Sequence, residues 1–318
     1  MTAPLLTETP AGLACVLASI RSRFGVTEGA EIARFASALF EKDGGPYVDE
    51  LGEDAAAALA AHAFRFLAAG GPLPRVRVFT PTFAADCWEP GGAVVETVMP
   101  DRPFIVDTIR EYLRSEDVEM RHLLHPLVAA SREPSSSERA HGRLRQLRSL
   151  ESEPQHESFV HVLLQPLPAE RLAVLEAGIA ERLNDVLLVT DDFQPMVERT
   201  EAVAREIEAY KGGGVAWDEE VQEVQDFLRW LVRGGCVFLG YRSLSLEEHE
   251  DTTVLRIEPD SGLGLLRKQE RSHYAAPTPV TTIPEPFRSR IVGGPLLVIA
   301  RTTAHAPVHR HARMDYVG

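Results

Sequence analysis

The sequence predicts an α+β protein with four parts: an N-terminal helical segment at residues 1–75, a mixed domain at 76–190, a helical connector at 191–235 and a β-rich unit at 236–318. Two observations predict this division. Apolar residues change from helical spacing to the alternation of strands near residue 75, and they return to helical spacing after residue 190. The length of 318 residues also fits two or three domains of roughly 100–200 residues each.

The composition is that of a globular protein with an acidic surface. Hydrophobic residues make up 44% of the chain and charged residues 25%, which excludes a wholly disordered, collagen-like or coiled-coil chain. The formal net charge of −14 at pH 7 repels phosphate backbones and anionic lipids. We therefore expect neither nucleic acid nor a membrane among the partners.

The compartment and the cysteines point to a cytoplasmic protein without disulfides. No apolar run reaches the ~18 residues of a transmembrane helix, and the first residues lack the pattern of a signal peptide. Cys15, Cys87 and Cys236 are odd in number and far apart. They form no CxxC or Cys/His spacing, so we expect no disulfide framework and no zinc site.

Three short helices are predicted before residue 75. Apolar residues recur at helical spacing from Leu13 to Ile20, from Ile32 to Phe40 and from Asp54 to Ala69. Glycine and proline interrupt this pattern at residues 44–46 and 70–72, where we expect the helices to end.

The mixed domain is predicted to have a ferredoxin-like βαββαβ order. After a first strand near Arg75 to Val78, its elements are a strand at 93–98, a helix with Ile105, Ile109 and Leu113 on one face, an apolar run at 118–130, a strand at 159–164, a helix at 172–183 and a weak last strand at Val186–Val189. The polar stretch from Glu133 to His156 has the composition of a mobile loop. This order is the split βαβ arrangement.

Acidic residues dominate the predicted connector. Residues 191–226 hold eleven acidic and three basic residues, a net charge of −8, and two helices separated by Gly212–Gly214 fit this stretch. We interpret it as a solvated connector, with an electrostatic docking site as the alternative.

The last part is predicted to be strands and turns. The expected strands are 236–241, 252–257, 262–266 and 295–300, with a loop from Arg271 to Pro286. No helix or cap closes the unit after its basic, histidine-rich segment. We therefore expect an incomplete unit, at the N-terminal end of a longer protein.

One turn is the candidate binding site. The strand up to Met99 runs into a helix through Asp101-Arg102-Pro103. Backbone N–H groups at a helix start attract a carboxylate or another small anion, and Arg102 can add a charged donor. The alternative is a capped helix without a ligand, with Asp101 near the cap and Pro103 in the first turn.

These residues resemble a known family. Asp101-Arg102-Pro103 inside this order of elements looks like an ACT domain, a ferredoxin-like module that commonly binds amino acids between paired copies. Seven further motifs resemble, in order, the N-terminal region of the large bacterial NAD-specific glutamate dehydrogenases. They are Val106–Ile109, His122–Pro126, Glu157–Val162, Phe227–Leu231, Phe238–Arg242, Gly262–Leu266 and Val308–Gly318.

The resemblance implies an ACT-like domain at 76–190, a PAS-like unit at 236–318, and a regulatory and oligomerisation region of an enzyme whose catalytic part lies elsewhere. NAD is then the cofactor of the full-length enzyme and not of this chain, which has no GxGxxG and three lysines in unsuitable surroundings. The expected partners are that catalytic region, further subunits and an amino-acid effector held by Asp101, Arg102, Phe104 and Asp107. Phe104 stands where many ACT domains have glycine. A free-standing amino-acid sensor is the alternative.

The histidines are expected to have structural roles. His122 and His125 are three apart in a predicted strand and point to opposite faces, and His161 follows in the next strand. We expect hydrogen-bonded side chains there, with no metal and no catalytic residue on this chain. His305, His309 and His311 lie among arginines, where docking against an acidic helix is the expected role.

Overall fold

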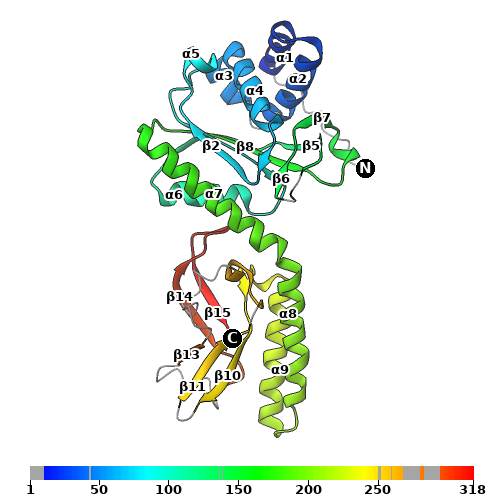
Figure 1. Ribbon diagram of the computed structural model, residues 1–318, viewed down its shortest axis with the longest axis vertical. Helices are drawn as coiled ribbons and strands as arrows, with labels where there is room; N and C mark the ends of the chain where they lie inside the picture. Colours follow the sequence, from blue (N-terminus) through cyan, green and yellow to red (C-terminus); the bar gives the residue numbers. More distant parts are fainter. Residues whose placement is uncertain are drawn as a thin grey trace. The chain divides into compact units, whose positions relative to one another are not determined.

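The computed structural model describes residues 11–42, 44–135, 137, 139–249, 252–258, 260–267, 280–282 and 294–318. The chain divides into two compact units, Met1–Asn184 and Asp185–Gly318. The N-terminal helices belong to the same unit as the mixed domain (Figure 1).

From residue 11, where the described part of the chain begins, four helices and not three open the first unit. They are α1 (Ala11–Arg23), α2 (Val26–Phe40), α3 (Gly45–Leu51) and α4 (Glu53–Ala68). The additional helix α3 begins at the Gly-Pro break that was expected to end helical structure, because Pro46 occupies its first turn. Proline tolerates that position, where its missing N–H has no helical partner.

An antiparallel sheet follows, with the strand order β2-β3-β8-β5-β7 and with β4 also paired to β8. The strands are β2 (Arg75–Phe79), β3 (Val94–Pro100), β4 (Met120–Leu124), β5 (Leu127–Arg132), β7 (Leu144–Arg148) and β8 (Glu157–Leu164). A separate pair joins β1 (Gly71–Pro72) to β6 (Ala140–His141). The short helices α5 (Phe83–Asp86) and η1 (Leu150–Ser152) lie in connections. The predicted strands at 93–98 and 159–164 are confirmed.

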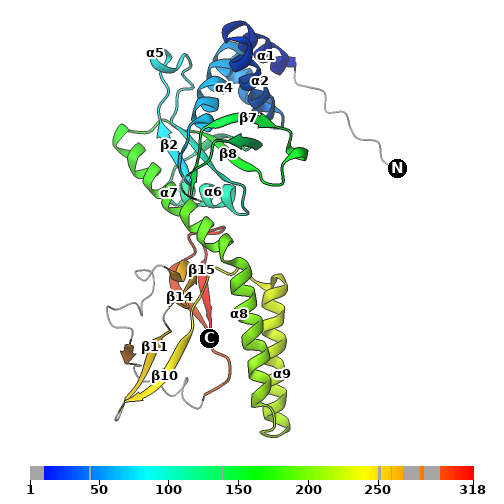
Figure 2. The ribbon, with the colours of Figure 1, turned by 45° about the vertical axis from the view of Figure 1, so that its right-hand side comes forward.

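Helices cover both faces of this sheet (Figure 2). Helices α6 (Ile105–Ser115) and α7 (Ala169–Asp191) lie on one face, and α1–α4 lie on the other. Ile105, Ile109 and Leu113 are buried, as the helical period predicted. On the opposite face, one apolar cluster joins the N-terminal helices to Val94, Val98, Phe159 and Leu163.

Two predictions about the mixed domain are wrong. Val186–Val189 is not a strand but part of α7, because these residues continue the buried helical face of Leu183. The sheet position next to β3 is taken by β2 instead. Residues 133–156 are also not one loop, since β7 pairs with β5 and buries Leu147.

The second unit begins with the predicted pair of helices. Helix α8 (Phe193–Glu206) continues into the 3₁₀ turn η2 (Ile207–Tyr210), and α9 (Val215–Trp230) continues into the π-helical turn η3 (Leu231–Gly235). Residues 212–214 separate them, as predicted. Ala204, Val224, Leu228 and Leu231 form the apolar core between these elements.

The described strands of the second unit form three small sheets, β10-β11-β13, β12-β9 and β14-β15. They are β9 (Gly240–Tyr241), β10 (Leu244–His249), β11 (Thr252–Ile257), β12 (Leu263–Gly264), β13 (Val280–Thr282), β14 (Ile299–His305) and β15 (Arg313–Val317), with the turn η4 (Leu265–Arg267). The predicted strand at 236–241 is shortened to β9. Residues 280–282 are a strand inside the predicted loop, whose other residues lie outside the described ones. Among the described residues, no helix is long and apolar enough to cross a membrane.

Candidate functional site

The predicted binding turn connects the end of β3 at Pro100 to the start of α6 at Ile105. The Asp101 N–H donates to the carbonyl of His156 at 2.9 Å, which ties the turn to the chain just before β8. Arg102 Nη1 donates to the Asp101 carbonyl at 3.1 Å. Asp101 and Arg102 are half-buried and Asp107 is exposed, so the turn is accessible from solvent.

Phe104 adopts an unusual backbone conformation directly before α6. Its φ of 75° and ψ of −1° are left-handed, a region that favours glycine over residues with a β-carbon. Glycine is the residue that the ACT resemblance leads one to expect here. The backbone after Asp101-Arg102-Pro103 is therefore left-handed in this chain too, although the residue is not glycine. Phe104 adopts this conformation at the cost of local strain.

One more side chain, His125, interacts electrostatically with Asp101 of this turn, and the sequence did not predict this proximity. His125, between β4 and β5, contacts Ser158 through Nε2 and Oγ at 2.8 Å. Partial burial lowers the pKa of His125, the Asp101 carboxylate opposes that shift, and Lys42 after α2 adds to it. Asp101 and Lys42 thus act electrostatically on the same ring, although no local sequence pattern joins these three segments.

This turn combines chemical groups that suit the two opposite charges of a small zwitterion. Arg102 and the N–H groups at the start of α6 suit a carboxylate, and Asp101 suits an ammonium group. The structure brings Asp101 within electrostatic reach of His125, and it places Asp107 in the first turn of α6 as an exposed residue.

A second polar cluster, which we call the buried network, lies between the sheet and α1–α4. Glu96 on β3 pairs directly with His161 on β8 in the sheet register. His161 Nδ1 donates to Glu96 Oε1 at 3.0 Å, and Arg77 Nε donates to Glu96 Oε2 at 2.8 Å. These two bonds and the charge of Arg77 hold the pKa of Glu96 low although the burial of its carboxyl opposes this.

Side chains from the N-terminal helices and α5 complete the buried network. Tyr47 on α3 approaches His161 Nε2 through its hydroxyl at 3.4 Å, and its ring stacks on His122 at 4.5 Å. Arg77 Nη2 lies 3.1 Å from His62 Nδ1 on α4. Because a guanidinium only donates, Nδ1 accepts, and His62 Nε2 carries the proton toward Asp86, 3.2 Å away.

The order Glu96, His161, Tyr47 resembles a carboxylate–histidine–hydroxyl triad, but its environment is unsuitable for catalysis. All three side chains are 0% exposed, so no substrate can reach the hydroxyl. Burial, with Glu50 and Glu96 nearby, also raises the pKa of Tyr47 and keeps it protonated. The buried network therefore connects the helices to the sheet.

His122, His125 and His161 have the hydrogen-bonded roles that were predicted. His122 Nε2 contacts Glu50 Oε2 at 2.6 Å, and His125 and His161 have the partners named above. His305 and His311 stack on each other with ring centroids 4.4 Å apart. Within the part of the chain that the structure describes, no three His, Cys, Asp or Glu side chains are grouped as metal ligands.

Comparison with known proteins supports the family resemblance. Residues 35–179 match the family model described as glutamate dehydrogenase, ACT1 domain. NAD-specific glutamate dehydrogenases of Pseudomonas aeruginosa and Halomonas elongata are 28% and 26% identical to this chain. Each match covers 77% of this chain and 15% of the relative. A Mycobacterium tuberculosis enzyme of the same name is 26% identical over 55% of the chain. The chain is therefore similar to an N-terminal region of the NAD-specific glutamate dehydrogenases, a small part of their length.

Proposed function

We propose that this chain is a regulatory and assembly region of an NAD-dependent glutamate dehydrogenase, which converts glutamate into 2-oxoglutarate and ammonia. The match of residues 35–179 to the ACT1 domain of glutamate dehydrogenases carries this proposal. ACT-type domains regulate by binding small molecules. The chain spans about 15% of the length of two of its relatives, which supports the proposal that catalysis belongs to another part of such an enzyme.

The residues of the chain support a non-catalytic role. Gly264 belongs to β12, and its N–H donates to Asp192 Oδ2 at 2.7 Å. This N–H is therefore used in a hydrogen bond within the second unit and is not offered to the phosphate of a dinucleotide. Lys211 Nζ donates to Glu208 at 2.9 Å and to Gln222 at 3.0 Å. Lys268 lies outside the described residues. We therefore expect no hydride transfer by this chain.

The proposed effector is an amino acid at the turn between β3 and α6. Its carboxylate would meet Arg102 and the N–H groups at the start of α6, and Asp101 or Asp107 would face its ammonium group. Phe104 carries a phenyl ring where many ACT domains have glycine, and we propose that this ring reduces the space for a ligand at the turn. We propose that binding is weak in a single copy and that a second copy completes the site.

Calorimetric titration with a panel of amino acids tests this proposal. We expect binding that is lost in Arg102→Ala, while NAD and glutamate together give no reduction of NAD in proportion to chain concentration. Arg114→Ala is the matched control, because Arg114 is exposed at the far end of α6. Binding that is equal in both variants would place the effector elsewhere, and turnover of NAD would refute the non-catalytic role.

A further inference from the structure

One exposed side of α9 presents negative charge beside an exposed aromatic ring. Glu219, Glu223, Asp226 and Trp230 follow at intervals of four, three and four residues, so they share a face, which we call the acidic face. Trp230 is 54% exposed. Asp226 pairs with Arg229 at 3.2 Å, but no described residue forms an ion pair with Glu219 or Glu223. Like charges four residues apart destabilise a helix unless a cation approaches them.

The connection between β14 and β15 presents the opposite charge. Residues 301–313, which we call the basic turn, contain three arginines and three histidines and no acidic residue. Arg301 pairs with Asp315 at 2.9 Å. Arg310 and Arg313 are exposed, and the described part of the chain gives neither of them a carboxylate partner. The stacked rings of His305 and His311 hold the two sides of the turn together.

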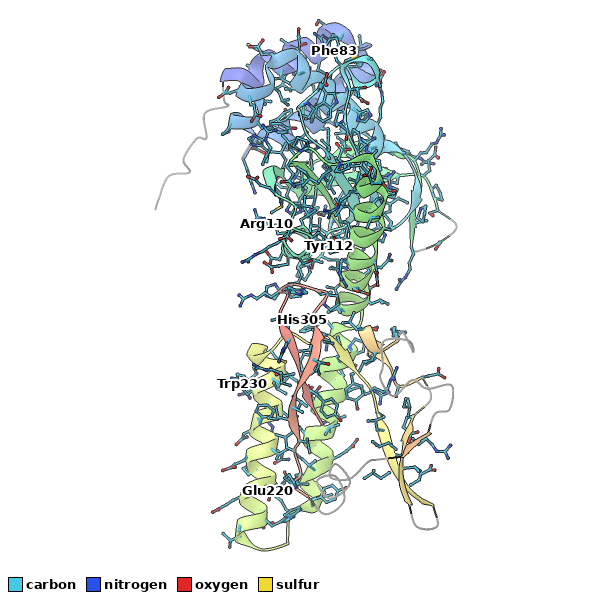
Figure 3. All side chains as sticks on the ribbon, turned by 90° about the vertical axis from the view of Figure 1, so that its left-hand side faces the viewer. Phe83, Arg110, Tyr112, Glu220, Trp230 and His305 are labelled. Atoms are coloured by element: carbon cyan, nitrogen blue, oxygen red, sulfur yellow. The ribbon has the colours of Figure 1, made fainter. Side chains whose placement is uncertain are left out.

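Among the described residues of one copy, no arginine of the basic turn forms an ion pair with Glu219 or Glu223. Figure 3 shows Trp230 on the part of α9 nearer to His305, whereas Glu220, next to Glu219, lies on the part of α9 farther from it. The acidic face points away from the core between α8 and α9, because Val224 and Leu228 on its other side are buried. A basic turn that reaches Glu219 and Glu223 must therefore come from another molecule.

We propose that the acidic face of α9 binds the basic turn of a second copy of this chain. Each copy carries both surfaces, so two such contacts related by a twofold axis close a dimer without leaving either surface open. Trp230 supplies the apolar anchor that charge pairs alone lack, since exposed ion pairs contribute little. This inference rests on the assembly role proposed above. It specifies a second copy of the chain as the partner, and the acidic face and the basic turn as the contacting surfaces.

Charge reversal in the full chain tests the pairing. In Arg310→Glu/Arg313→Glu the turn becomes acidic, and in Glu219→Arg/Glu223→Arg the face becomes basic. Either variant alone faces like charges, and we expect its dimerisation constant in sedimentation to weaken at least about tenfold. An equimolar mixture of the two variants restores opposite charges at both contacts, and we expect recovery to within about threefold of the unchanged chain.

A control variant with two reversed charges outside the proposed interface distinguishes a specific contact from a general effect of charge. Arg143→Glu/Arg145→Glu reverses two exposed arginines in the first unit and should leave dimerisation unchanged, and circular dichroism verifies folding of every variant. If the unchanged chain dimerises but reversal has no effect, or the mixture does not recover, the interface is refuted and the assembly role stands. If the unchanged chain is a monomer at all concentrations, this interface and the assembly role of the isolated chain both fail.

Discussion

The two faces of the sheet in the first unit are covered by helices for different physical reasons. Toward α6 and α7, the central strands β3 and β8 direct no ionisable side chain, and burial of apolar surface drives the packing. Toward α1–α4, the same strands direct Glu96, Glu157 and His161 into the protein. Apolar packing tolerates many arrangements, whereas buried ionic groups require defined partners. The N-terminal helices are thus held to the sheet by specific bonds as well as by burial.

Among the variants considered, removal of the Glu96 carboxylate should lower the free energy of unfolding the most. Glu96→Ala leaves His161 buried without its acceptor and Arg77 without its counter-charge, and we expect a loss of about 3–5 kcal/mol in the free energy of unfolding. Urea unfolding followed by circular dichroism measures it. Glu28→Ala removes an exposed pair with Arg65 and should cost less than about 1 kcal/mol. Equal costs for the two variants would contradict the role of the buried network.

On the other face, steric fit should decide stability. Gly178 on α7 lies against the ring of Tyr112 on α6, and a β-carbon there would overlap that ring. In an open helix, Gly→Ala stabilises by about 1 kcal/mol. Here we expect Gly178→Ala to destabilise by about 1–3 kcal/mol, and the additional change Tyr112→Ala to remove most of that steric penalty. A more stable Gly178→Ala variant would show that the two helices are not closely packed.

Acid should weaken the first unit by a smaller amount. Burial and the neighbouring Arg77 lower the pKa of His62 below its ordinary value of 6.5, although Glu96 and Asp86 oppose the shift. The unfolded chain then binds this proton more readily than the folded chain, so stability falls as pH drops below about 6.5, by at most about 1.4 kcal/mol per pH unit for one histidine. Unfolding between pH 7.5 and 5.5 should show a shallower decline in His62→Gln. An unchanged slope would exclude His62 as a contributor.

Local periodicity explains which parts of the fold were predictable. Ile105, Ile109 and Leu113 repeat at helical spacing, and burial confirms them. Val186–Val189 is an apolar run that fits a strand or a buried helix equally well. In the structure, α7 extends to Asp191 and includes these four residues. Glu133 to His156 looked like a loop because β7 is an edge strand with mostly exposed side chains.

Local sequence patterns also predicted only part of the candidate binding turn and of the buried network. The turn at Asp101 and Arg102 was found because a strand, a proline and a helix start follow one another in sequence. Asp101 and Lys42 act on the ring of His125 from distant segments, which no local pattern connects. The buried network had one signal: Glu96 and His161 are ionisable residues in the middle of otherwise apolar strands, and such residues need partners when buried.

Deletion of residues 1–69 from the full chain tests most directly whether the N-terminal helices belong to the sheet domain. The deletion exposes Glu96, His161 and the apolar cluster around Phe159 to water. We predict that backbone amides of β3 and β8 lose their protection against hydrogen exchange, because the sheet then has one uncovered face. Protection of these amides at the level of the full chain would contradict the account and would show that the domain folds from residue 76, without α1–α4.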